Sequence, residues 1–66
     1  MKTRLKIERA IKNLTQEELA KQINVSRQTI NSIETGRYVP STILALKISK
    51  VFGKPVNEIF ELENTD

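Results

Sequence analysis

Residues 15–36 read TQEELAKQINVSRQTINSIETG and predict two short helices joined by a tight turn. Thr15 can cap the first helix, and Glu18 three residues later completes a capping box. Asn24 stands where the chain must leave this helix, and asparagine is one of the few residues besides glycine that accept the left-handed conformation there. Ser26 can then cap the second helix. The stretch therefore predicts a pair of helices held at a fixed angle.

The two helices of this pair, at about residues 16–23 and 27–35, are each apolar along one edge. Ala20 in the first helix is small enough for the second helix to cross close by. The second helix is polar on its other side, where guanidinium, amide and hydroxyl groups can reach base edges in a DNA groove. The apolar edges consist of Leu19, Ala20 and Ile23 in the first helix and Ile30 and Ile33 in the second, and the exposed polar residues are Arg27, Gln28, Asn31 and Ser32.

This pattern resembles the helix-turn-helix of Cro and the phage repressors, the XRE family of transcriptional regulators. The resemblance covers about residues 5–60 and extends to Arg9, Gly36-Arg37, Pro40-Ser41 and Val56-Asn57-Glu58-Ile59-Phe60. Two positions depart from the family pattern, because Asn24 replaces a common glycine and Glu8 stands where apolar residues are more usual. The resemblance implies a compact, all-α, five-helix domain of the lambda-repressor type over residues 1–66, with the helix-turn-helix at about 16–35.

The resemblance also implies a sequence-specific, double-stranded DNA-binding transcriptional regulator whose second motif helix enters the major groove. Arginine suits guanine and glutamine suits adenine, because each pairing can be bidentate. Amide and hydroxyl groups at the start of the first motif helix and beside the second can bind phosphate oxygens. We therefore expect base contacts from Arg27, Gln28, Asn31 and Ser32, phosphate contacts from Gln16, Thr29, Arg37 and Tyr38, and a structural ion pair between Arg9 and Glu34.

Three further helices are predicted around the motif, at about residues 5–12, 42–52 and 55–60. Gly53 ends the second of these, and Pro55 suits the first turn of the last one. The chain ends, MKTRL and FELE, alternate apolar and polar residues and fit either a short antiparallel β pair or frayed termini. The apolar contacts are expected from Ile7, Ala10, Ile11 and Leu14 near the first helix and from Leu44, Ala45, Ile48, Val51 and Phe52 in the fourth.

The composition limits the classes of function. With no cysteine and no histidine, the chain has no thiolate or imidazole for a metal and no imidazole base to activate its serines. It also has no Gly-rich phosphate loop, so we expect no enzyme activity, no metal and no cofactor. No apolar run approaches the ~20 residues needed to span a bilayer. We expect a cytoplasmic, nucleoid-associated protein without contact to a membrane, and no small-molecule effector is evident.

Positive charge is concentrated in the first part of the chain. Residues 1–37 contain eight Lys or Arg against four Glu, whereas residues 38–66 contain three Lys against four acids. Local rather than total positive charge promotes phosphate binding, because affinity comes from counterion release at the contact surface. Charge alone leaves open an ordinary solvated helical surface, and the helix-turn-helix pattern is what favours DNA.

Assembly follows from the small size of the motif. One helix reads few base pairs, so a symmetric homodimer on a palindromic operator is the economical arrangement, and we expect a repressor. This family often forms its two-fold contact near the last helix, where the apolar residues Val39, Val56, Ile59 and Phe60 would supply it. Two alternatives remain open from the sequence. The same patch would serve an antitoxin-like protein-interaction module, and the lysines alone would serve an architectural DNA binder without sequence preference.

Overall fold

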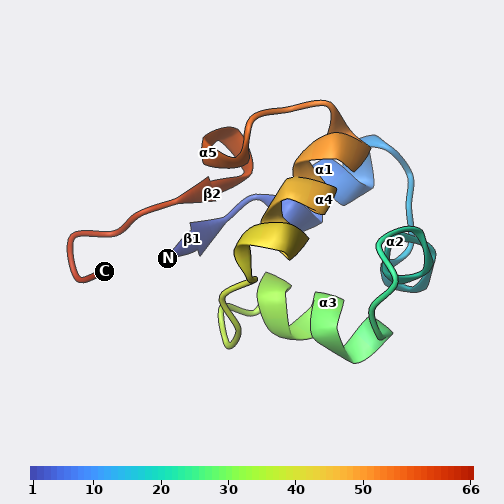
Figure 1. The fold of residues 1–66 in the computed structure, drawn as a ribbon, viewed down its shortest axis with the longest axis horizontal. Helices are drawn as coiled ribbons and strands as arrows, with labels where there is room; N and C mark the ends of the chain where they lie inside the picture. The colour runs from blue at the N-terminus through green and yellow to red at the C-terminus, as the bar shows by residue number, and fades with distance from the viewer.

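The computed structural model describes residues 1–66 and contains five helices and one two-stranded sheet (Figure 1). The predicted five-helix, all-α fold class is confirmed. None of the helices has the length and apolar character needed to cross a bilayer. In chain order the elements are β1 (Lys2–Thr3), α1 (Leu5–Ile11), α2 (Gln16–Gln22), α3 (Arg27–Glu34), α4 (Thr42–Phe52), α5 (Val56–Ile59) and β2 (Phe60–Glu61).

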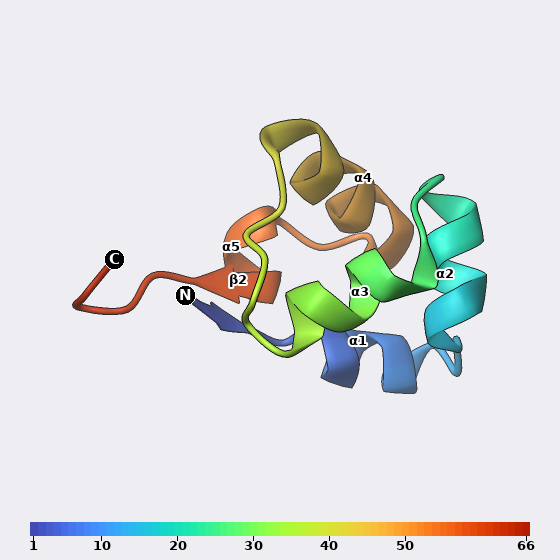
Figure 2. The same ribbon diagram turned by 90° about the horizontal axis from the view of Figure 1, so that it is seen from below.

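The two chain ends form the β pair that the alternating sequence allowed. β1 runs antiparallel to β2, with Lys2 opposite Glu61 and Thr3 opposite Phe60. The Arg4 backbone N–H continues the pairing by donating to the Ile59 carbonyl at 2.7 Å. The termini therefore lie side by side, at the end of the molecule away from α2 (Figures 1 and 2).

Side-chain caps define where the helices begin. The Thr15 hydroxyl accepts a hydrogen bond from the Glu18 backbone N–H, and the Glu18 carboxylate accepts one from the Thr15 N–H, so α2 has the complete capping box. Ser26 caps α3 and Ser41 caps α4 through bonds to the N–H groups three residues later. Asn24 leaves α2 in the left-handed conformation, with φ 60°. The predicted caps and turn are thus present.

The core lies between α1, α3 and α4, with α3 running between the other two helices in Figure 2. Every helix contributes to it, which is how a chain this short keeps five helices in fixed positions. The predicted stripe of α4 faces the core, with Leu44, Ile48 and Phe52 buried and Ala45 and Val51 packed at its edge. The fully buried large side chains are Leu5, Leu19, Ile30, Ile33, Ile48 and Ile59.

The expected rotation of α1 is wrong. Ile7 and Ile11, which we expected to pack inward, are 47% and 68% exposed, and Ala10 is exposed as well. Leu5 and Glu8 face the core instead, at 0% and 3% exposure. The rotation is possible because the Glu8 carboxylate does not enter the core unpaired: the Lys54 Nζ lies 2.9 Å from its Oε1. Leu14, beyond the end of α1, packs against the core as expected.

Candidate nucleic-acid interface

α2 and α3 pack directly against each other and are joined by a short turn. The Val25 side chain packs against the core, and its backbone N–H donates to the Ala20 carbonyl at 3.0 Å. Asn24 supplies the change of direction just before it, and Ser26 starts α3 just after it. Because the turn is held by these contacts on both sides, the outward face of α3 has a fixed orientation.

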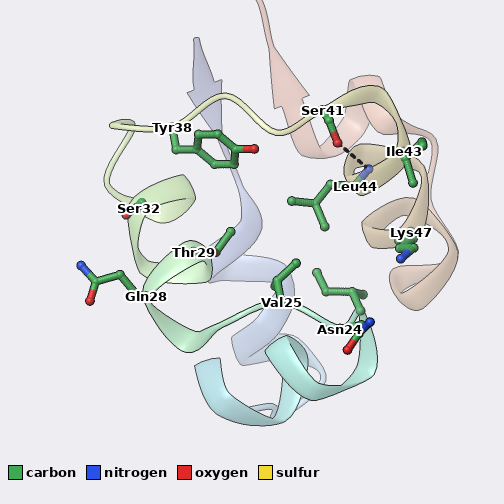
Figure 3. A pocket seen from close by; sticks show the side chains of 11 residues that line it. Asn24, Val25, Gln28, Thr29, Ser32, Tyr38, Ser41, Ile43, Leu44 and Lys47 are labelled. Atoms are coloured by element: carbon green, nitrogen blue, oxygen red, sulfur yellow. Dashed lines mark hydrogen bonds between the residues drawn. The ribbon is translucent and has the colours of Figure 1, made fainter.

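That outward face is polar. Arg27, Gln28 and Asn31 are exposed and Ser32 is half-buried, while Ile30 and Ile33 hold the opposite face in the core. In Figure 3 the Gln28 side chain extends away from the body of the protein. The four side chains expected to contact bases therefore lie on one continuous surface of α3.

An ion pair fixes the last turn of α3 to α1. Arg9 Nε donates to Glu34 Oε2 at 2.8 Å, and Arg9 Nη2 donates to Glu34 Oε1 at 3.2 Å. Arg9 Nη1 also donates to the Leu14 carbonyl at 2.8 Å. The side chains of Arg9 and Glu34 are only 16% and 4% exposed, and the hydrogen bond to Glu34 raises the pKa of Arg9. The guanidinium thus ties together α1, the loop that follows it and the end of α3.

Gln16 connects this ion pair to the polar face of α3. Its Nε2 donates to Glu34 Oε1 at 3.1 Å and to Asn31 Oδ1 at 3.3 Å. Its Oε1 accepts a hydrogen bond from Arg27 Nη1 at 3.3 Å. Gln16 was expected to face phosphate from the start of α2, but here both hydrogens of its amide group are already used inside the protein.

A groove of about 500 Å³ lies between α3, the loop at residues 37–41 and the start of α4 (Figure 3). We call it the α3–α4 groove. Thr29 and Tyr38, both expected to contact phosphate, lie in it, whereas Arg37 is exposed in the adjoining loop and Gln16 lies at the other end of the motif. The polar groups that line the groove are Asn24, Gln28, Thr29, Ser32, Tyr38, Ser41 and Lys47, and the apolar ones are Ile23, Val25, Ile43 and Leu44.

Lys47 is the one ammonium group among these residues, and our sequence analysis missed it. The sequence gives only a weak signal, since Lys47 precedes Ile48 at the border of the apolar stripe of α4. Its proximity to α3 depends on how α4 packs across the motif, which the local pattern does not specify. Ser41, for which we expected only a capping role, also lines the groove.

On another side of α4 lies an apolar groove of about 260 Å³, bordered by α4, the loop before it and Val56 of α5. We call it the α4–α5 groove, and three of the four residues expected at a dimer contact line it: Val39, Val56 and Phe60. Val39 is 64% exposed, Val56 is half-buried, and Phe60 is a core side chain at 6% exposure. The other lining residues are Met1, Pro40, Thr42, Ala45 and Leu46.

The fourth residue expected at the dimer contact, Ile59, is wrongly placed by our prediction. It is 1% exposed and belongs to the core. The short helix α5 packs against α4 and turns the Ile59 side chain into the core cluster, and the Arg4 N–H bonds to the Ile59 carbonyl beside it. Leu46 is 57% exposed in the same groove and was missed, because it lies off the buried stripe of α4.

Two short helices joined by a tight turn, the second with a polar outward face, are the arrangement found in helix-turn-helix DNA-binding proteins. Residues 5–59 match the helix-turn-helix family model, and the chain belongs to this family, of the XRE type. It is 54% identical over 66 residues to an uncharacterized HTH-type transcriptional regulator of Methanocaldococcus jannaschii, covering 100% of both chains.

Two other relatives agree with this assignment. The uncharacterized HTH-type transcriptional regulator YgzD of Bacillus subtilis is 46% identical over 63 residues, which is 96% of each chain. The crystal structure of the clp gene regulator ClgR from Corynebacterium glutamicum matches with a TM-score of 0.75 and 31% identity, over 82% of this chain and 57% of that one. The protein is therefore a DNA-binding transcriptional regulator of helix-turn-helix type.

Proposed function

We propose that residues 1–66 act as one DNA-binding domain that represses transcription by binding a palindromic operator as a homodimer. α3 would enter the major groove of each half-site, with α2 braced against the DNA backbone. The observation that carries this proposal is the polar face of α3, which is exposed for reading yet tied to α1 and α2 by the Arg9–Glu34 pair and Gln16.

Base reading would come from the four residues of that face. Arg27 is suited to guanine O6 and N7, and Gln28 to adenine N6 and N7. Asn31 and Ser32, one turn further along, would reach bases only when α3 lies deep in the groove. Removing Arg27 or Gln28 should cost about 1–3 kcal/mol on the best operator and relax the preference at one base position.

Backbone binding would use groups on both sides of α3. Thr29 and Tyr38 would bind phosphate in the α3–α4 groove together with Lys47, and Arg37 would bind from the exposed loop beside it. The start of α2 would face the DNA backbone through its helix dipole, while the two amide hydrogens of Gln16 stay bonded to Glu34 and Asn31 inside the protein. The groove suits a DNA backbone because it combines hydroxyl and ammonium donors with apolar side chains that can face deoxyribose.

The α4–α5 groove is the proposed contact between the two copies, centred on Val39, Leu46 and Val56, with Phe60 as its floor. Thr42, Ala45 and Leu46 line this groove, whereas Ile43, Leu44 and Lys47 line the α3–α4 groove. The two grooves therefore use different faces of α4. A second copy bound at the α4–α5 groove would leave α3 free for DNA.

Selection of bound sequences from a random DNA pool tests this proposal in one experiment. We expect a palindromic motif with half-sites about 34–36 Å, one turn of DNA, apart. The Arg27→Ala and Gln28→Ala variants should each lose preference at one position per half-site while keeping the wild-type melting temperature. An unenriched pool would overturn sequence-specific reading, and an enriched motif without two-fold symmetry would overturn the homodimer.

The α4–α5 groove also supports a second candidate, an antitoxin-like module that holds another protein through the same apolar residues. The two candidates differ in their response to salt. Operator binding that neutralises several phosphates should weaken steeply between about 50 and 200 mM salt, because counterions are released on binding. A flat response, or DNA binding too weak to measure, would favour the interaction module.

A further inference from the structure

We propose that the Arg9–Glu34 ion pair determines, through Gln16, which way the amide of Asn31 faces when α3 reads DNA. In this arrangement Gln16 and Glu34 are positioning residues, and Asn31 presents its Nδ2 hydrogens to the base. The inference rests on the proposed reading of DNA by α3 and deepens it, because it specifies the base atoms that Asn31 recognises.

The two partners of the ion pair have fixed roles as hydrogen-bond donor and acceptor. The Arg9 guanidinium can only donate hydrogen bonds, and an ionised Glu34 carboxylate can only accept them. Arg9 reaches both carboxylate oxygens, at 2.8 and 3.2 Å, and Glu34 is almost fully enclosed, with 4% of its side chain exposed. A group that meets Glu34 Oε1 from α2 must therefore be a donor.

Gln16 is that group, and its amide has only one orientation that suits its surroundings. The Nε2 lies 3.1 Å from Glu34 Oε1, and the Oε1 lies 3.3 Å from Arg27 Nη1. The flipped amide would place an oxygen against the carboxylate and an NH₂ group against the guanidinium, so it would lose both bonds and add two repulsive contacts. The orientation of Gln16 thus follows from the charges on either side of it.

The remaining hydrogen of Gln16 Nε2 orients the amide group of Asn31. It points to Asn31 Oδ1 at 3.3 Å, so the oxygen of the Asn31 amide is turned toward α2. The Nδ2 group is left without a partner inside the protein and is the part of Asn31 available to a base. An isolated asparagine could turn either end of its amide to the DNA, but this one is held in one of the two states.

The consequence is a defined preference at one base position. Nδ2 hydrogens pair with acceptors in the major groove, which are guanine O6 and N7, adenine N7 and thymine O4. Cytosine offers the N4 donor there, so it meets Nδ2 with no bond and an unfavourable contact. We therefore expect cytosine to be depleted at the position that Asn31 contacts.

The experiment is selection from a random DNA pool with four proteins: wild type, Asn31→Ala, Gln16→Ala and Gln22→Ala. Asn31→Ala identifies the position, as the one whose preference disappears. Gln22→Ala is the matched control, because Gln22 is an exposed glutamine of the same helix outside the hydrogen-bonded group. The melting temperature of each variant is measured alongside, and Gln16→Met replaces Gln16→Ala if the alanine variant does not fold.

In the wild type, cytosine should be depleted about fivefold at the Asn31 position, as expected for one net hydrogen bond. In Gln16→Ala the depletion should shrink to below about twofold, because Asn31 can then turn its oxygen to the base. The Gln28 position, and the whole profile of Gln22→Ala, should match the wild type. A change of preference at one position is something that a loss of stability would not produce.

Three other outcomes overturn the inference. Enrichment of cytosine at the Asn31 position in the wild type would mean that Oδ1 faces the base. An unchanged profile in Gln16→Ala would mean that Asn31 is not held by Gln16. Uniformly weaker binding to all sequences, with the same profile, would mean that Gln16 acts only as a phosphate ligand. An unenriched wild-type pool is a different result, since it overturns the proposed function itself.

Discussion

The outward face of α3 is polar, whereas the α4–α5 groove is lined mostly by apolar side chains, and the two regions are built in opposite ways. On α3, Arg27 and Asn31 are each hydrogen-bonded to Gln16, and through it to the end of the helix. In the groove, Val39 and Leu46 are 64% and 57% exposed and have no polar partner to fix them.

The difference matches the kind of contact each region can make. Hydrogen bonds are directional, so a face that discriminates between bases needs donors and acceptors held in place before DNA arrives. Apolar contact is non-directional and scales with area, so a groove for a second copy needs shape and exposed surface rather than fixed polar atoms. The outward face of α3, proposed to read sequence, is therefore hydrogen-bonded to its surroundings, and the α4–α5 groove has almost no polar contacts.

Arg9 and Glu8, which are neighbours in α1, form two ion pairs that also differ in how firmly they are held. Arg9 makes a two-pronged pair with Glu34 toward α3, whereas Glu8 pairs with the single ammonium of Lys54 near α5. Glu34 and Glu8 are equally enclosed, each with 4% of the side chain exposed, but Lys54 is 39% exposed and Arg9 only 16%. The Arg9–Glu34 pair beneath the outward face of α3 is therefore the more buried of the two and is held by two hydrogen bonds.

The largest effect is expected from breaking the pair beneath α3. Arg9→Ala would leave the Glu34 carboxylate buried without its cation and should cost about 3 kcal/mol in the free energy of unfolding. We take the lower end of the usual range because Gln16 still donates to Glu34 Oε1. Denaturant or thermal unfolding of the variant measures the loss.

The double variant Arg9→Met with Glu34→Leu supplies the control for this prediction. It removes both charges and keeps most of the buried volume, so it should recover much of the stability lost in Arg9→Ala. The double variant should lose the sequence preference at the Asn31 position, since Gln16 no longer has Glu34 as its acceptor. Additive losses in the single variants and their combination would mean that the two side chains do not act as a pair.

The next effect concerns the α4–α5 groove. Val56→Asp or Leu46→Asp would put an unpaired carboxylate into an apolar contact and should weaken a homodimer by about 2 kcal/mol or more. Operator affinity should fall far more than non-specific affinity, because only the operator uses both half-sites. Sedimentation at micromolar concentration gives the oligomeric state, and Ile43→Asp, on the other groove, is a control that should leave it unchanged. A wild type that sediments strictly as a monomer would contradict the proposed contact.

The Glu8–Lys54 pair should contribute less to stability than the Arg9–Glu34 pair. Lys54→Ala removes the cation from Glu8, but water can reach the carboxylate through the space left by a side chain that was 39% exposed. We expect a loss of about 1 kcal/mol in the free energy of unfolding. Adding Glu8→Leu should recover the lost stability, because the site then becomes an apolar position facing the core. A loss as large as that of Arg9→Ala would show that the two ion pairs contribute equally to stability.

The sequence predicted the parts of this molecule that are local. Thr15 with Glu18, Asn24, Ser26 and Ser41 act within a few residues of themselves, so the helix starts and the turn could be read from spacing alone. The rotation of α1 could not, because it depends on Lys54, which lies 46 residues from Glu8. Apolar spacing favoured Ile7 and Ile11, whereas the structure buries Leu5 and Glu8, the latter paired with a cation far away in the sequence.

The same limit applies to the candidate site. The residue types on α3 were readable from the motif, but the contacts of Gln16 needed the packing of α1, α2 and α3 together. Lys47 and Leu46 were missed because their surroundings are formed by other elements. Ile59 was wrongly assigned to the surface because its burial depends on how the four-residue helix α5 packs against α4, which local spacing does not specify.

The smallest predicted effect concerns the capping box at the start of α2, the helix that packs against α3. Hydrogen bonds from the backbone and side chain of Thr15 lower the pKa of Glu18 from its usual value of 4.5. The folded state therefore favours the ionised carboxylate, and the stability it adds is present above the usual pKa and lost as the pH falls through the lowered one. Glu18→Gln keeps a capping amide but cannot titrate. The wild type should thus melt at a higher temperature than Glu18→Gln at about pH 7, and the difference should vanish by about pH 3.

Glu17→Gln is the matched control for this measurement, because Glu17 lies in the same first turn but makes no capping hydrogen bond. It removes a charge from the same turn but no capping hydrogen bond, so at about pH 7 it should lower the melting temperature less than Glu18→Gln does. The comparison separates the hydrogen-bonded carboxylate from a carboxylate that is merely near the helix start. If both variants melted at the same temperature at about pH 7, the capping box would contribute no more than charge, and α2 would be held by its core residues, by Gln16 and by the Val25 turn.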